Sequence, residues 1–241
     1  MEATDAIHST NKRGILVAES RLLNSLPRHI CDQIVEASEH LRFKRGEILI
    51  TAREPARYVY FPIDCMVSMV VSLESGNTVE AATVGSDGFV GISSFLGMEQ
   101  ADITAVVQLE GEAWRLPVEV FRKLLDNEAF RTTLGAFAAK TVATIAQSAA
   151  CNTFHPVHER LARWLLLVRD STERTEFALT QEFIAVMLGV HRPTVTIAMR
   201  LLESAELIEH KRGLIRIVAP DALADAACEC YRLSSWNRGK V

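Results

Sequence analysis

The sequence predicts an α+β protein in which an N-terminal β-roll, of jelly-roll type, is joined by one long helix to a C-terminal winged helix-turn-helix. Three observations predict this fold. Short alternating segments from residue 41 to 116 end at glycine-containing turns, as in antiparallel sandwiches. Residues 128–151 keep the period of a single helix. Residues 179–218 combine two short helical patterns with two β-branched segments around a basic turn.

Length and composition fit a soluble protein with more than one core. The 241 residues are 49% hydrophobic and 23% charged, and no apolar run approaches the roughly 20 residues of a membrane span. The polar N-terminus has no segment of signal-peptide type, and its first 14 residues are expected to be mobile. We therefore expect a cytoplasmic protein that does not bind membranes. We divide it into a β-roll domain with flanking helices (1–126), a long helix with a hinge (127–154) and a winged helix-turn-helix domain (155–241).

Charge is distributed unevenly between these parts. Residues 155–241 carry 12 basic and 11 acidic residues, whereas the rest of the chain carries 14 basic and 19 acidic residues. The C-terminal part is therefore slightly positive although the whole chain has a net charge of −4. Binding to nucleic acid would depend on local basic patches rather than on overall charge.

Helical patterns are expected on both sides of the β-roll. One helix follows Pro27, and another begins at Pro117 with Phe121, Leu124 and Leu125 on its apolar face. The long pattern from about Glu128 to Cys151 follows. It carries small and apolar residues at alternating steps of four and three, which predicts a coiled-coil seam for a homodimer. The predicted seam is Leu134, Ala138, Thr141, Ile145 and Ser148. The alternative is that this helix packs only on its own domain.

A hinge and two further helical patterns complete the C-terminal part. Asn152 to Pro156 breaks the long helical pattern, and Pro156 makes the segment a predicted hinge. A helix over 157–168 is expected to place Trp164 in the core, as is expected of Trp114 in the roll. A last helix is expected over 220–233.

The helix-turn-helix pattern spans Leu179 to Leu207. Thr180 is a favourable N-cap, and Gly189 can adopt the positive φ of a sharp turn. In the second helix a buried stripe is predicted at four positions spaced i, i+3, i+4 and i+7, namely Val195, Ala198, Met199 and Leu202. The opposite face is short or basic, as suits contact with base edges and phosphates. A helix–glycine–helix pattern alone would equally fit two ordinary packed helices.

The residues after the second helix favour a DNA-binding domain. Residues 207–218 read as two short strands around a basic turn, with Lys211 and Arg212 at the tip of a wing that could meet the phosphate backbone. The predicted DNA-contacting residues are Thr180, Gln181, His191, Arg192, Pro193, Thr194, Thr196, Ile197, Arg200, Lys211 and Arg212.

With these motifs the chain resembles the Crp/Fnr superfamily of bacterial transcription regulators over nearly its whole length. The resemblance is carried by LTQEFIAVMLGVHRPTV, by RLLESAELI and by the strand pattern of the N-terminal half. GSDGFVGISSFLG, ERLARWLL and CECYR resemble a branch of the family with no assigned ligand. The resemblance implies a parallel homodimer through the long helix, double-stranded DNA as a partner and contact with RNA polymerase.

The resemblance also implies roles at the DNA and effector sites. Arg192 corresponds to the family's guanine-contacting arginine. Pro193 and Ile197 replace two other residues that contact bases in the best-known members, so a different DNA site is expected. Relatives that bind cyclic nucleotides use a Gly-Glu pair and an Arg-Ser pair around the phosphate. Here Phe89 follows Gly88, and Ala101-Asp102 stands at the second pair. We therefore do not expect cyclic AMP at this candidate effector pocket, which comprises Gly88, Phe89, Val90, Gly91, Ala101 and Asp102.

Cofactors and catalysis find little support in the sequence. Five scattered cysteines in a cytoplasmic-type chain argue against disulfides. Cys228 and Cys230 are close in sequence, but on a helix their thiols would point to different sides, and His155 and His158 lack nearby ligands. We therefore expect no metal site, no haem and no cofactor. The catalytic signatures of common hydrolases and nucleotide-dependent enzymes are absent, so an enzyme is not expected.

The sequence thus predicts a homodimeric transcription regulator whose small-molecule effector is unknown or absent. Two alternatives stay open. One is a cyclic-nucleotide-type binding module in which DNA binding is secondary. The other is a thiol redox sensor that uses Cys151 or Cys228.

Overall fold

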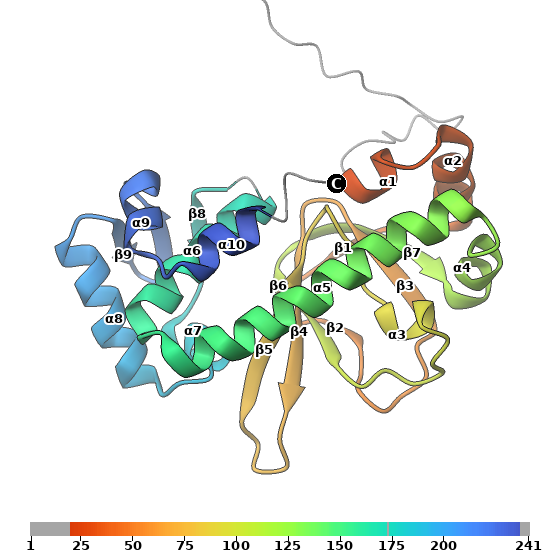
Figure 1. Cartoon of the computed structure of the whole chain (residues 1–241). Helices are drawn as coiled ribbons and strands as arrows, with labels where there is room; N and C mark the ends of the chain where they lie inside the picture. Colours follow the sequence, from red (N-terminus) through yellow and green to blue (C-terminus); the bar gives the residue numbers. More distant parts are fainter. Residues whose placement is uncertain (1–19, 173, 237–241) are drawn as a thin grey trace, which may run out of the picture.

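The computed structural model describes residues 20–172 and 174–236. The first 14 residues, for which the sequence predicts mobility, lie outside the described part. Two domains lie side by side, and one long helix, α5 (Glu128–Phe154), runs across the β-roll and ends beside the C-terminal domain (Figure 1). The predicted α+β class and the order of roll, long helix and winged domain are confirmed.

The β-roll consists of two antiparallel sheets that enclose one core. The first has the strand order β1-β7-β3 and the second the order β2-β6-β4-β5. The strands are β1 (Glu39–Phe43), β2 (Ile48–Ile50), β3 (Tyr58–Pro62), β4 (Met66–Ser72), β5 (Thr78–Val84), β6 (Thr104–Leu109) and β7 (Gly111–Pro117). Short strands predicted from residue 41 onward are present, but β1 and β2, which follow each other in the sequence, lie in different sheets.

Short helices close the roll. They are α1 (Arg21–Asn24), α2 (Arg28–Ala37), α3 (Ile92–Phe95) and α4 (Val118–Leu124). Pro27 precedes α2 and Pro117 precedes α4, as expected of a residue whose fixed φ favours a helix start. Asn127 caps α5 by accepting a hydrogen bond from the amide of Phe130 at 3.1 Å.

The C-terminal domain begins directly after α5. The predicted break between the helices is narrower than expected, because α5 continues to Phe154 and only His155 and Pro156 separate it from α6. The other elements are α6 (Val157–Thr172), β8 (Glu176–Ala178), α7 (Gln181–Leu188), α8 (Arg192–Ser204), β9 (Ile208–Lys211), β10 (Leu214–Ile217), α9 (Pro220–Ala226) and α10 (Cys230–Trp236).

Two features of this domain differ from the prediction. The polar segment before the helix-turn-helix contains β8, which pairs with β10 and makes the wing a three-stranded sheet. The last helix is two helices, because the chain turns at 227–229 between α9 and α10. The three-residue strand was not predicted because the residues around it in the sequence are polar. The turn was not predicted because its alanine-rich sequence is typical of a continuous helix.

The two domains share buried surface. Met66 and Val70 on β4 pack in the same apolar cluster as Leu161 and Leu165 on α6. Trp164 of α6 also donates a hydrogen bond to the carboxylate of Glu80 on β5 at 3.0 Å. Both predicted core tryptophans, Trp114 and Trp164, are buried. Within the described residues, no helix is both long and apolar enough to cross a membrane.

Candidate nucleic-acid interface

The first helix of the helix-turn-helix is positioned by its two ends. The hydroxyl of Thr180 accepts a hydrogen bond from the amide of Phe183 at 3.2 Å, which confirms it as the N-cap of α7. Gly189 ends α7 with φ +62°, a left-handed conformation that glycine adopts more readily than residues with a Cβ. A Cβ at Gly189 would also lie 2.9 Å from Val79 of the β-roll. Glycine therefore serves both the turn and the contact between the domains.

The second helix, α8, buries one face and exposes the other. Its predicted stripe is confirmed, because Val195, Ala198, Met199 and Leu202 are all nearly inaccessible to solvent. The predicted reading face lies outward, with His191, Arg192, Pro193, Ile197 and Arg200 exposed and Thr194 and Thr196 half-buried. The apolar side chain of Ile197 is 62% exposed on this face. An aliphatic group here could contact a thymine methyl.

Two contacts between α7 and α8 organise this outward face. The Thr196 hydroxyl donates to the side-chain oxygen of Gln181 at 2.7 Å, so two predicted contact residues hold each other. The guanidinium Nε of Arg192 lies 2.8 Å from a carboxylate oxygen of Glu182 on α7. Sequence inspection missed Glu182, since nothing in the spacing shows that α7 and α8 bring positions 182 and 192 together. This ion pair joins α7 to the first turn of α8 at the exposed surface.

The wing places basic residues at its tip. Lys211 and Leu214 are paired across a two-residue turn in which Arg212 has φ +50° and Gly213 has φ +80°. Positive φ at both positions fits the turn types that suit the twist of a β-hairpin. Lys211 and Arg212 are exposed, as predicted. Arg216, in contrast, forms ion pairs with Glu176 and Glu209 on the neighbouring strands.

The candidate effector residues divide between core and cavity. Gly88 and Phe89 are buried, and the Phe89 ring packs against Phe137 of α5 with 5.3 Å between centroids. A Cβ at Gly88 would lie 2.2 Å from the Phe137 ring. Val90, Gly91, Ala101 and Asp102 instead line a cavity of about 190 Å³ between the roll and α5. Its other walls are mainly apolar residues such as Met69 and Ile145.

This cavity lacks the chemistry of an anion site. None of its lining residues is a lysine or arginine, and Asp102 is its only charged residue. A phosphodiester needs a cation or several amide donors to replace its hydration. The cavity therefore suits a small, mainly apolar molecule better than a cyclic nucleotide.

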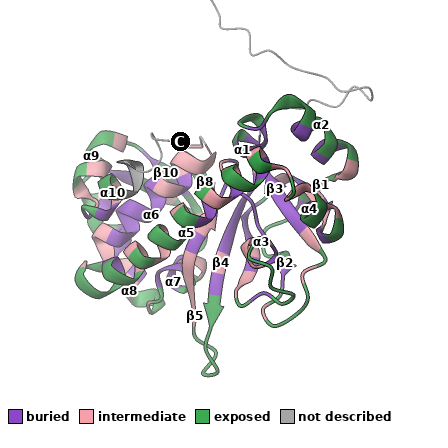
Figure 2. Cartoon of the chain, turned by 45° about the vertical axis from the view of Figure 1, so that its right-hand side comes forward, coloured by how far each residue is buried: buried purple, intermediate pink, exposed green. Residues whose placement is uncertain are grey.

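The predicted dimer seam needs correction. Leu134, Ala138 and Thr141 are buried in the single chain, on the side of α5 that packs on its own roll, and Ile145 lines the cavity beneath the helix. Ser148 is half-buried. An outward stripe with the same steps of four and three starts two residues earlier. This alanine stripe comprises Thr132, Ala136, Ala139, Ala143, Ala146, Ala150 and Thr153, all of them exposed (Figure 2).

The comparisons with known proteins agree with both halves of this description. Residues 159–226 match the Crp-like helix-turn-helix domain, and residues 40–128 match the cyclic nucleotide-binding domain. The chain belongs to the Crp/Fnr superfamily. It thus has the two domains of a Crp/Fnr-type transcription regulator, and both matches are to binding domains rather than to an enzyme family.

Solved structures show the same fold. A transcriptional regulator of the Crp/Fnr family from Eubacterium rectale superposes with a TM-score of 0.67 at 18% identity, covering 86% of this chain and 97% of that one. A CRP-family regulator from Thermus thermophilus gives a TM-score of 0.66 at 21% identity over 78% of this chain and 96% of its own. The c-di-GMP responsive regulator CLP of Xanthomonas campestris gives 0.66 at 15% identity over 79% and 99%. No curated protein sequence gives a significant match.

Proposed function

We propose that this Crp/Fnr-type protein is a homodimer that binds double-stranded DNA in a sequence-specific manner and regulates transcription. The observation that carries the proposal is the outward face of α8. Arg192, Ile197 and Arg200 are exposed there, on the side of the helix opposite its buried stripe. A helix of this width fits the major groove, and an arginine near its start can contact the O6 and N7 acceptors of guanine. Thr194 and Thr196 lie beside this arginine.

The wing and the first helix supply the sequence-independent part of binding. Our candidates for phosphate contacts are Lys211 and Arg212 at the hairpin tip, Gln181 at the start of α7 and Thr194 in the first turn of α8. Such contacts fix the register of a protein on the duplex but carry no sequence information. They also make affinity strongly dependent on salt, because each neutralised phosphate releases counterions.

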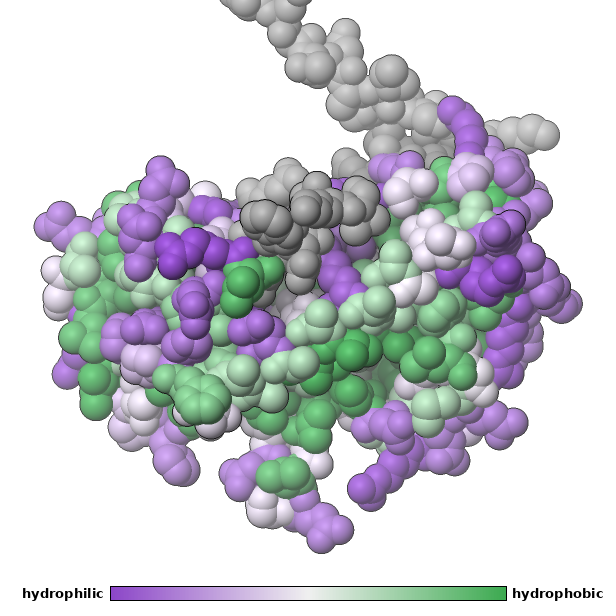
Figure 3. Space-filling model, in the orientation of Figure 1, coloured by the Kyte–Doolittle hydropathy of each residue, from purple (hydrophilic) through white to green (hydrophobic). Residues whose placement is uncertain are grey.

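The alanine stripe on α5 supports the homodimer. Its small side chains allow two helix backbones to approach closely, and the apolar Val142 beside it is 66% exposed. Figure 3 shows a continuous apolar band along this side of the molecule, over α5 and the roll. A two-fold axis along this helix would present two α8 helices to two half-sites, roughly 34 Å apart on one face of the DNA. A cytoplasmic location and contact with RNA polymerase are expected of such a regulator.

The small cavity beneath α5 is the place where an effector would act, if the protein has one. Its occupant would touch both the roll and Ile145 of α5, so binding could shift the population of α5 arrangements. From the apolar lining we infer a small apolar effector in preference to a cyclic nucleotide. The lining thus argues against a cyclic nucleotide as the occupant of this cavity.

The direct test is to measure affinity for a selected DNA site with wild-type protein and with Arg192→Ala. The loss of one bidentate guanine contact should weaken cognate binding by roughly 1–3 kcal/mol and relax preference at one base pair. Arg122→Ala, which removes an exposed arginine from α4 of the roll, is the matched control and should bind normally. Equal affinity of all three proteins for cognate and random DNA would refute sequence reading by α8.

A further inference from the structure

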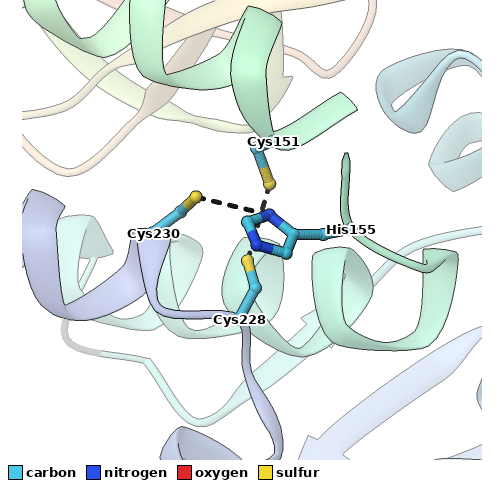
Figure 4. Close-up of side chains that lie close together, drawn as sticks. All are labelled: Cys151, His155, Cys228 and Cys230. Atoms are coloured by element: carbon cyan, nitrogen blue, oxygen red, sulfur yellow. Dashed lines mark hydrogen bonds between the residues drawn. The ribbon is translucent and has the colours of Figure 1, made fainter. Parts of the chain in front are cut away.

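Three cysteines and one histidine come together where the long helix meets the C-terminal end of the chain (Figure 4). Cys151 lies in the last turn of α5, and His155 is the residue that follows this helix. Cys228 lies in the turn between α9 and α10, and Cys230 is the first residue of α10. Their ligand atoms all lie within 4.8 Å of one another. We refer to these four residues as the Cys₃His cluster.

The turn between α9 and α10 corrects the expectation from sequence. On a continuous helix, thiols two positions apart would point to different sides. Residues 227–229 are instead non-helical, so both thiols point into the same space (Figure 4). His155, at the junction of α5 and α6, completes the cluster, whereas His158 takes no part in it.

We propose that the Cys₃His cluster is a structural binding site for a single Zn²⁺ ion. Four ligands at bond lengths of about 2.0–2.3 Å around a tetrahedral ion lie roughly 3.5–4 Å from one another. Here the sulfurs of Cys151 and Cys228 are 3.5 Å apart, and the sulfur of Cys230 is 3.5 Å from Nδ1 of His155. Three thiolates with one imidazole form a standard ligand set for structural zinc.

Nearby side chains are placed to support such a site. Nε2 of His155 lies 3.9 Å from a carboxylate oxygen of Glu229, an arrangement that orients a ligand histidine whose Nδ1 faces the metal. The amide of Gln147 donates to the sulfur of Cys230 at 2.9 Å. Arg163 of α6 is buried with Nη1 4.0 Å from the sulfur of Cys151. Its positive charge offsets the net negative charge of three thiolates around Zn²⁺.

Other occupants fit the geometry less well. An iron–sulfur cluster places several irons between its protein ligands, which must then lie farther apart than around one ion. A disulfide between Cys151 and Cys228 would use two of the sulfurs, require an external oxidant, and leave His155 and Cys230 at the cluster without a role. All three cysteines are at most 4% exposed, which protects a structural site from exchange with solvent.

The position of the site gives zinc a specific structural task. The ion would tie the end of α5 to the α9–α10 turn, and so fasten the DNA-binding domain to the long helix at the hinge. This inference does not depend on DNA binding, because the metal content of the purified chain tests it directly.

The experiment is to measure zinc by mass spectrometry in full-length protein purified under reducing conditions. We expect one Zn²⁺ per chain for wild type and near-complete loss for Cys228→Ser and Cys230→Ser. Cys31→Ser, which alters a buried cysteine of α2, is the control and should retain zinc. Glu229→Gln should retain the site but weaken Zn²⁺ affinity by roughly 10–100-fold in a chelator competition.

Replacement of zinc by Co²⁺ in the wild-type chain gives an answer even if the cysteine variants do not fold. Tetrahedral cobalt with three thiolates should show visible d–d bands together with thiolate charge-transfer absorption. The proposal is overturned if wild-type protein supplied with Zn²⁺ binds none, or if Co²⁺ gives no thiolate bands. It is also overturned if folded cysteine variants keep full zinc content, or if mass spectrometry finds a Cys151–Cys228 disulfide in metal-free native protein.

Discussion

Phe89 and Arg192 show, at the scale of single side chains, how the two domains differ. Phe89 lies in the roll with its ring packed between Phe61, Phe121 and Phe137, and is completely buried. It therefore adds to the core rather than to a polar site. Arg192 is exposed and forms an ion pair with Glu182 at the surface. The core around Phe89 is thus apolar, whereas the outward face of α8 carries charged side chains.

The close contact of Gly88 with α5 leads to a prediction for stability. A methyl group at this position would overlap the Phe137 ring, so Gly88→Ala should destabilise the protein by about 1–3 kcal/mol in chemical denaturation. Adding Phe137→Leu should recover part of the loss, because the two changes act on the same space. Additive losses in the double variant would show that Gly88 matters for another reason.

At the scale of elements, α5 explains what sequence patterns could and could not predict. The helix and its period followed from the sequence, but α5 is apolar on both faces. Its buried and outward stripes have the same spacing, so the register of Leu134 and Ala138 could not be distinguished from that of Ala136 and Ala139. Only the position of the roll shows which stripe remains for a partner.

The same limit applies to residues that meet from distant elements. The cap at Thr180, the buried stripe of α8 and the wing tip depend on local spacing and were predicted correctly. Three other contacts depend on how distant elements pack, and no local sequence pattern indicates that packing. They are Glu182 with Arg192, Glu80 with Trp164, and the three cysteines with His155.

The corrected register of α5 predicts the effect of a charge in the dimer seam. Ala143→Glu would bring two carboxylates together where small side chains must pack closely, and should shift the protein to monomers in light scattering. The matched change Lys123→Glu on the exposed surface of α4 should leave the dimer intact. A dimeric Ala143→Glu protein would place the interface elsewhere.

We predict that the contact between Glu80 on β5 and Trp164 on α6 makes stability depend on pH. Burial raises the pKa of its carboxyl from 4.5 to about 7, although hydrogen bonds from Ser68 and Trp164 and the charge of Arg163 act in the opposite direction. A raised pKa in the folded state means that this group favours folding below pH 4.5 and loses that contribution as pH rises to about 7.

Glu80→Gln keeps a hydrogen-bonding side chain and removes the titration. Relative to this variant, wild-type protein should lose up to about 3 kcal/mol of unfolding free energy between pH 4.5 and pH 7.5, measured by urea denaturation across that range. Glu74→Gln, at an exposed position, should show no such difference. A constant difference between Glu80→Gln and wild type at every pH would show that Glu80 does not titrate in this window.

At the scale of the whole molecule, the roll, α5 and the winged domain form one connected body rather than two independent units. The shared core between β4 and α6, the contact of Gly189 with Val79, and the Cys₃His cluster all lie between parts of the chain that are distant in sequence. A change at any of these contacts would alter where α8 stands relative to the α5 axis. In a homodimer, that placement sets the distance between the two recognition helices.

The most direct test of the DNA-binding proposal is to select genomic fragments with purified protein and to footprint the bound sites at 50 and 200 mM salt. We predict a two-fold symmetric site with half-sites about one helical turn apart, and affinity that falls by orders of magnitude between about 50 and 200 mM salt. Absence of any enriched sequence, or protection of a single half-site by a monomer, would contradict the proposal that paired α8 helices read DNA.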